Sequence, residues 1–247
     1  LMGPDLPHPL ATRLPAYATA LLPLPRPARF AIVCLPRTGS ELLVRLLDSL
    51  DDLRCDGELL AQPPRWPRRL LEGRAALARA RGATAWGCKI VAHQVMWHPE
   101  RYGEGSFFAR LDERVWKLMV LKRRNILAIT LSMMHAARSQ WHFSGGHDVA
   151  FEAMEVDTAE VIATLHTLDG QVKWMDEVMG GIEHLELFYE DDLQEPAEAR
   201  VAPPNASAAS AERAAASLMI LARMSFLLWV GYWDMRSHRR AASVTVR

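Results

Sequence analysis

The sequence is poor in cysteine and has no net charge. Its three cysteines show no CxxC or Cys/His spacing, which argues against a disulfide framework and against structural zinc. A reducing, cytoplasmic setting is therefore expected. The 29 lysines and arginines are cancelled by 29 aspartates and glutamates, so overall charge gives no support for a nucleic-acid binder. Any bound anion must be held by a local site.

Long uninterrupted apolar runs are also missing. Four prolines between residues 15 and 27 break the start of the chain, and no signal peptide is predicted there. The most apolar stretch, residues 214–233, contains Arg223 and has a polar start. We interpret it as a buried or amphipathic helix, and we expect no integral membrane segment.

What is present is an ordinary globular composition. The chain has 247 residues, of which 50% are hydrophobic and 23% charged, enough to build a sizeable core. We predict three regions: a Pro-rich lead-in over residues 1–29, an α/β domain over 30–196, and an Ala-rich linker with a C-terminal helix over 197–247.

Apolar runs alternate with helical spacing in the middle region. Strands are predicted at residues 30–35, 86–91, 118–121 and 185–189, and helices at 42–50 and 126–138. This order predicts an α/β fold with a mainly parallel sheet flanked by helices on both faces. Ligands of such sheets bind beyond the carboxyl ends of the strands, where Arg37 and the Arg123/Arg124 pair fall.

The first cluster is the polar turn at residues 36–40. Gly39 lets a ligand approach the backbone, Thr38 and Ser40 add hydroxyl groups, and Arg37 adds a planar cation. A turn between a strand and a helix N-terminus is a ready anion site. The alternative is a simple helix cap, with Thr38 or Ser40 as the capping residue and Arg37 in solvent.

The second cluster follows the strand at 118–121. Arg124 closes the strand, and Ser132 lies about two turns into the next helix, so both could reach one anion. The alternative is a surface basic patch. Neither cluster has the two glycines and the lysine of a Walker A motif, and the sequence shows no metal-binding pattern, so no metal site is predicted.

Four segments, in order, resemble PAPS-dependent sulfotransferases, where PAPS is 3′-phosphoadenosine-5′-phosphosulfate. Residues 33–40 (VCLPRTGS) are similar to the 5′-phosphosulfate loop, and the spacing from Arg124 to Ser132 is similar to the 3′-phosphate motif. Residues 86–89, together with the Gly57-Glu58 pair, resemble the bacterial branch typified by trehalose 2-sulfotransferase. Residues 188–196 resemble a Y-E-D-L…P segment of many members.

The resemblance implies a P-loop-kinase-like fold, PAPS as sulfuryl donor, PAP (3′,5′-ADP) as product, no metal and a hydroxyl acceptor such as a carbohydrate or glycolipid. A homodimer is compatible with it. By this resemblance the loop residues (Pro36, Arg37, Thr38, Gly39 and Ser40) hold the 5′-phosphosulfate, whereas Arg124 and Ser132 hold the 3′-phosphate.

Catalytic roles follow from the same comparison and from general chemistry. Arg37 and Lys89 are predicted to stabilise charge on the leaving phosphate, with Lys89 at the bridging oxygen. Glu58 is the first candidate for the general base, by resemblance to the trehalose-type enzymes, and His93 is the second because its pKa suits neutral pH. A structural role is the alternative for Lys89 and for His93.

Two departures from the family pattern stand out. Glu41 occupies a position where the family usually has Thr or Ser, and a carboxylate there repels sulfate unless it points away or pairs with an arginine. After Pro196 the chain no longer follows the family. A catalytically degenerate nucleotide-binding module and a P-loop kinase therefore remain alternative functions.

Overall fold

The computed structural model describes residues 15–18, 27–103, 106–113, 116–139 and 155–193. The predicted C-terminal region at 197–247, most of the predicted lead-in at 1–29 and the predicted helix within 214–233 lie outside these residues.

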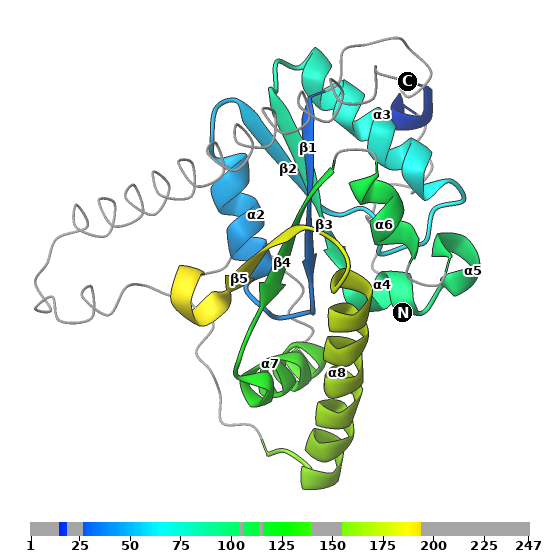
Figure 1. The fold of residues 1–247 in the computed structure, drawn as a ribbon. Coiled ribbons are helices and arrows are strands. Elements are labelled where there is room, and N and C mark those ends of the chain that lie inside the picture. The colour runs from blue at the N-terminus through cyan, green and yellow to red at the C-terminus, as the bar shows by residue number, and fades with distance from the viewer. Residues whose placement is uncertain (1–14, 19–26, 104–105, 114–115, 140–154, 194–247) are drawn as a thin grey trace, which may run out of the picture. The chain divides into compact units, whose positions relative to one another are not determined.

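The core of the described chain is a sheet of five strands. They are β1 (Ala28–Cys34), β2 (Leu53–Glu58), β3 (Ala85–Val91), β4 (Trp116–Lys122) and β5 (His184–Phe188). The order across the sheet is β2-β3-β1-β4-β5, and every neighbouring pair is parallel. The predicted α/β fold with a parallel sheet is confirmed (Figure 1).

The central strand β1 is buried on both faces, as its continuous apolar run predicted. Alternate side chains point to opposite faces, so Ala31 and Val33 join one core cluster while Phe30 and Ile32 face the other way. Gly87 stands opposite Phe30 in the register, and a Cβ there would lie 2.1 Å from the Phe30 ring. The glycine in β3 therefore makes room for an aromatic side chain of β1.

Helices cover both faces of this sheet. Helix α2 (Ser40–Asp48) packs on one side against β2 and β3. Helices α3 (Pro67–Ala80), α6 (Ser106–Asp112) and α8 (Thr158–Met179) supply Leu71, Phe108 and Met175 to the cluster on the other side. Figure 1 shows α2 on one side of the sheet and α3 and α6 on the other. Further helices are α4 (Ala92–Met96), α5 (Pro99–Tyr102) and α7 (Ile126–Ser139).

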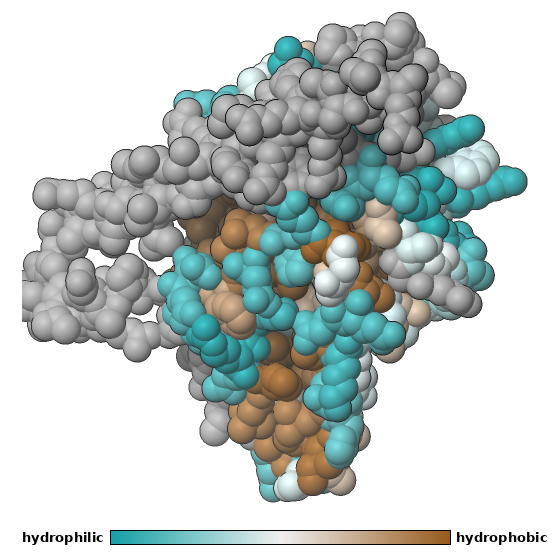
Figure 2. Space-filling model, in the orientation of Figure 1, coloured by the Kyte–Doolittle hydropathy of each residue, from teal (hydrophilic) through white to brown (hydrophobic). Residues whose placement is uncertain are grey.

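Several apolar side chains stay on the surface. Leu127 and Leu131 of α7 and Ile162 of α8 are 48%, 38% and 50% exposed, and Figure 2 shows apolar surface over these two helices. Nevertheless, none of the described helices combines the length and the apolarity that crossing a bilayer requires.

The structure differs from the sequence prediction at one strand and at one turn. Strand β2 was not predicted, because this edge strand contains three charged residues and has no continuous apolar run. The predicted acidic turn after β5 is a short π-helix, Tyr189–Leu193. The other predicted strands and the helices beginning at Ser40 and Ile126 are confirmed.

Candidate functional site

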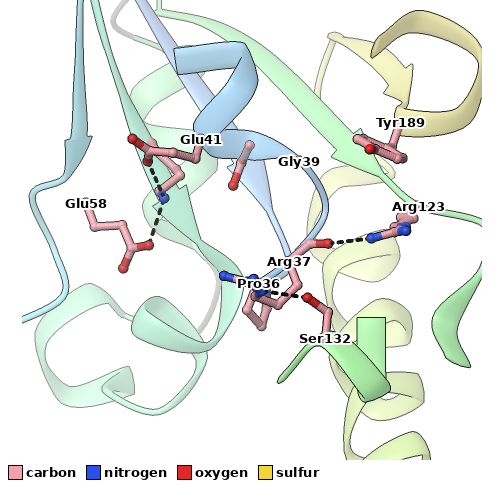
Figure 3. A pocket seen from close by; sticks show the side chains of 10 residues that line it. Pro36, Arg37, Gly39, Glu41, Glu58, Arg123, Ser132 and Tyr189 are labelled. Carbon is pink, nitrogen blue, oxygen red and sulfur yellow. Dashed lines mark hydrogen bonds and ion pairs between the residues drawn. The ribbon is translucent and has the colours of Figure 1, made fainter. Parts of the chain in front are cut away.

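A cavity of about 260 Å³ lies at the carboxyl ends of the central strands. It is formed where the β1–α2 loop meets the ends of β2, β3, β4 and β5, the edge at which parallel sheets bind ligands. Its lining residues are Pro36, Arg37, Gly39, Ser40, Glu41, Glu58, Lys89, Arg123, Ser132 and Tyr189, as Figure 3 shows. Three of the four residues predicted to be catalytic, Arg37, Glu58 and Lys89, therefore share one cavity.

The β1–α2 loop turns sharply through two left-handed residues. Arg37 has φ 61° and Gly39 has φ 83°, a conformation that a non-glycine residue adopts at an energetic cost. The ring of Tyr189 covers Gly39 so closely that a Cβ on Gly39 would lie 2.3 Å from Tyr189 Cδ2. Glycine is thus required at position 39 by the backbone and by its neighbour.

The loop hydroxyl groups do not cap the helix. Gly39 is the N-cap residue of α2 and gives it no side-chain hydrogen bond, while buried Thr38 donates its Oγ1 hydrogen to the Leu35 carbonyl at 2.9 Å. Ser40 is the first residue of α2. The simple-cap alternative is therefore wrong, and the first N–H groups of α2 remain at the positive end of the helix dipole.

Arg37 is partly buried rather than solvated. Its Nε donates to Ser132 Oγ at 2.9 Å, and Arg123 Nη1 donates to the Arg37 carbonyl at 3.1 Å. Burial lowers the pKa of Arg37, and the nearby charge of Arg123 lowers it further. Two guanidinium groups held this close repel each other, so an anion between them would relieve the repulsion.

Arg123 was not predicted as a site residue. Its guanidinium lies 4.6 Å from the centre of the Tyr189 ring, and its buried Nε has no hydrogen-bond partner among the described residues. The nearest carboxylate oxygen to that Nε, on Glu190, is 3.9 Å away. The only sequence signal for Arg123 was its place in the basic run 122–124.

Arg124, which was predicted to hold an anion with Ser132, does not line the cavity. It is exposed, its two terminal nitrogens each pair with an Asp191 oxygen at 2.5 Å, and it stacks 4.2 Å from the centre of the Phe188 ring. The hydrogen bond from Arg124 lowers the pKa of Asp191. Ser132 lines the cavity and contacts Arg37, whereas Arg124 contacts Asp191 and Phe188.

A carboxylate already occupies the start of α7. Glu190 accepts hydrogen bonds from the backbone N–H groups of Arg124 and Asn125 at 3.1 and 3.2 Å. These bonds to the charged form lower the pKa of Glu190 despite the opposing effect of its partial burial. The π-helix after β5 therefore supplies the counter-charge for this helix end.

The opposite side of the cavity holds a lysine between two carboxylates. Lys89 of β3 is only 4% exposed, and its Nζ lies 2.8 Å from Glu58 Oε1 and 3.5 Å from Glu41 Oε2. Burial alone would lower the pKa of Lys89, but the hydrogen bond and charge of Glu58 outweigh it and raise the pKa. Lys89 is therefore charged at neutral pH.

Glu41, the departure from the family pattern, is accommodated by cations. Besides Lys89, its carboxylate is 3.4 Å from Arg45 Nε, one helical turn along α2. Its charge thus pairs with Lys89 and Arg45, which reduces the repulsion expected for an anion at the loop.

His93, the second candidate base, lies in α4 and does not line the cavity. Its ring packs 4.7 Å from the ring of Trp97. Burial lowers the pKa of His93, and Glu58 opposes this shift only in part. Geometry therefore favours Glu58 over His93 as the group that can reach a ligand in the cavity.

The charges divide the cavity into two sides. Three cations, Arg37, Lys89 and Arg123, face two carboxylates, Glu41 and Glu58, which leaves one net positive charge. Figure 3 shows both glutamates on one side of the loop and Arg123 with Tyr189 on the other. An anion is expected at the arginine side, with a proton acceptor across from it.

No protein-family model matches the sequence. A stretch of the chain is 34% identical over 132 residues to nodulation protein H of Rhizobium meliloti strain 1021. The match covers 47% of this chain and 50% of nodulation protein H, so the chain spans about half the length of this curated relative.

Proposed function

We propose that the chain is a sulfotransferase that moves a sulfuryl group from PAPS to a hydroxyl acceptor. One observation carries the proposal: a cavity has two arginines and a helix N-terminus on one side and the Glu58–Lys89 pair on the other. Such a site can hold a phosphosulfate and place a base opposite it.

The similarity to nodulation protein H supports a sulfotransferase family for this chain. It does not favour the trehalose-type branch, so the resemblance of Gly57-Glu58 and residues 86–89 to that branch stays a prediction. PAPS as the donor and a carbohydrate or glycolipid as the acceptor are likewise part of the proposal.

The proposed step is an in-line transfer. The acceptor oxygen forms a new bond to sulfur as the bond between sulfur and the bridging oxygen of the 5′-phosphate breaks. Glu58 takes the proton of the acceptor hydroxyl, and PAP leaves with the electron pair on its phosphate oxygen. The protein contributes position and electrostatic stabilisation, as it does in phosphoryl transfer.

The roles of the cations follow from their places. Arg37 and the first N–H groups of α2 hold the 5′-phosphosulfate, and Lys89 neutralises charge at the bridging oxygen. Ser132, Arg123 and Arg124 are the candidates for the 3′-phosphate. Of the two arginines, Arg123 lines the cavity. Arg124 must break its ion pair with Asp191 before it can bind a phosphate.

The test is transfer from labelled PAPS by the wild-type protein and by Glu58→Gln. Loss of a general base costs about 10²–10⁴-fold in rate. Glu113→Gln is the matched control, because Glu113 is exposed and does not line the cavity. Activity of Glu58→Gln within about threefold of wild type would remove Glu58 from this role.

Two alternatives have distinct outcomes in a thermal-shift comparison. A ligand that binds the native state raises the melting temperature. Stabilisation by PAP without turnover of PAPS would identify a nucleotide-binding module. Stabilisation by ATP with Mg²⁺, and none by PAP, would identify a kinase.

A further inference from the structure

Gln94 is a buried polar residue with no role in the chemistry described so far. It is 5% exposed and lies in α4, which begins directly after β3. Both ends of its side-chain amide are hydrogen bonded. Oε1 accepts from the backbone N–H of Val91 at 3.3 Å, and Nε2 donates to Glu58 Oε2 at 2.8 Å.

These contacts determine which end of the amide faces Glu58. A backbone N–H can only donate, so Val91 takes the amide oxygen and leaves the NH₂ group for Glu58. The second carboxylate oxygen, Glu58 Oε1, is 2.8 Å from the Lys89 ammonium, which also can only donate. Each oxygen of Glu58 therefore has its own donor, and each keeps a second lone pair for another contact.

We propose that Gln94 is the positioning residue of Glu58, holding the carboxylate fixed in rotation so that its remaining lone pairs face the acceptor hydroxyl. This inference rests on the proposed function. Lys89 alone does not fix the carboxylate, because its Nζ is shared with Glu41. Gln94 supplies the second point of attachment, and it acts through Glu58 without touching the substrate.

The anchoring of Gln94 itself makes this arrangement rigid. Its amide oxygen is held by the backbone at the junction of β3 and α4, two residues from Lys89 along the chain. The lysine and the amide that hold Glu58 therefore come from one short, buried segment. A base held at two points keeps its place to within a fraction of an ångström, which proton transfer requires.

Two substitutions separate the contacts of Gln94. Gln94→Leu removes both hydrogen bonds, whereas Gln94→Glu keeps an acceptor for the Val91 N–H and replaces the donor to Glu58 with a carboxylate. Gln171→Leu is the matched control, because Gln171 is a buried glutamine (4% exposed) of α8 that does not line the cavity. Circular dichroism and thermal melting verify that each variant is folded.

The assay measures sulfuryl transfer from labelled PAPS to glucose, trehalose and chitobiose. Both Gln94 variants are expected to lower kcat by about ten- to hundredfold, the size of effect that a misplaced catalytic group produces. The acceptor KM should stay within about threefold, because no substrate contact is lost. Gln171→Leu should behave as wild type.

A double-mutant cycle with Glu58→Gln tests whether Gln94 acts through Glu58. In the Glu58→Gln background, Gln94→Leu should change the residual rate less than about twofold. A full kcat in both Gln94 variants, or losses that add in the double variant, would overturn the proposal for Gln94 and leave the sulfotransferase assignment standing.

A second readout does not depend on transfer. The side-chain amide of Gln94, identified in ¹⁵N NMR by its loss in Gln94→Leu, should shift in Glu58→Leu and not in Glu113→Gln. An unmoved amide would overturn the positioning role. If the amide still shifts but the wild-type protein transfers sulfate to none of the acceptors, the proposed function is overturned. The contact between Gln94 and Glu58 would then have no catalytic role.

Discussion

Arg37 Nε donates a hydrogen bond to Ser132 Oγ across 2.9 Å, which joins the loop after β1 to the helix after β4. The two residues were predicted to hold opposite ends of one nucleotide, and in the structure they contact each other. Ser132 thus orients the Arg37 guanidinium.

The first prediction concerns the planar fork of Arg37. Arg37→Lys keeps the charge but loses the Nε donor and the bidentate geometry. We expect calorimetric titration to show PAP binding weakened about ten- to hundredfold, because hydrogen bonds between charged groups contribute about 1.5–3 kcal/mol. Arg45→Lys, on the exposed side of α2, should bind PAP as wild type does. Equal affinities for both variants would remove Arg37 from the anion site.

The second prediction separates two causes of strain at Gly39. In Gly39→Ala, the left-handed backbone alone should lower the free energy of unfolding by about 1–3 kcal/mol. The clash of the new Cβ with Tyr189 should lower it further. Gly82→Ala is the control, since Gly82 also has a positive φ of 95° but no atom near its missing Cβ. Urea denaturation measures both.

A double variant completes this test. Tyr189→Ala removes the ring that the new Cβ meets, so Gly39→Ala combined with Tyr189→Ala should be less destabilised than the sum of the single changes. Strict additivity would show that Tyr189 does not cover Gly39 in solution.

The third prediction distinguishes Arg123 from Arg124 as the partner of a 3′-phosphate. If Arg124 binds the phosphate, Arg124→Ala weakens PAP binding and Asp191→Asn strengthens it, because the competing carboxylate is gone. If Arg123 is the partner, Arg123→Ala weakens binding and Asp191→Asn has no effect. Adenosine 5′-phosphate, which lacks the 3′-phosphate, is the control ligand in both titrations.

The fourth prediction concerns Glu41. Its carboxylate lines the cavity and faces any anion at the loop, although Lys89 and Arg45 offset its charge. Glu41→Thr should therefore tighten PAP binding several-fold at low salt, and high salt should shrink the difference by screening. Weaker binding by Glu41→Thr would show that Glu41 supports the loop rather than repels the ligand.

The fifth prediction is a pH dependence of stability. Burial lowers the pKa of His93 in the folded state, so the unfolded chain binds the extra proton at higher pH. Its contribution to stability is present above the unfolded value near 6.5 and is lost as the pH falls through the lower folded pKa. Melting temperatures between pH 7 and pH 5 should fall less for His93→Asn than for wild type, and an identical decline would contradict the burial of His93.

The sequence predicted the parts of the fold that depend on local apolar pattern. Strand β1 and helix α2 follow from a continuous apolar run and from helical spacing, and Arg37 and Lys89 lie near the ends of predicted strands, whereas Glu58 was proposed from the family resemblance alone. Strand β2 was not predicted because it is an edge strand that is only partly buried. Its charged residues interrupt the apolar run by which a buried strand is predicted.

The choice between Arg123 and Arg124 could not come from local pattern. Neighbouring side chains at the end of a strand point in different directions, so only one of them lines the cavity. The residue that pairs with Arg124, Asp191, lies far along the chain and cannot be identified from the local pattern. Gln94 was missed for the same reason, because its importance lies in a contact with a residue on another strand.

The contact between the Tyr189 ring and Gly39 has a consequence for the order in which the cavity is assembled. Gly39 lies in the loop after β1, and Tyr189, the residue that covers it, follows β5 along the chain. Because β1 pairs with β3 and β4, and Tyr189 directly follows β5, the β1–α2 loop is not covered until β5 has been synthesised and has paired with β4. A chain cut short before residue 189 should therefore leave this loop uncovered, and if the proposed function is right it should bind PAP less tightly than the full chain.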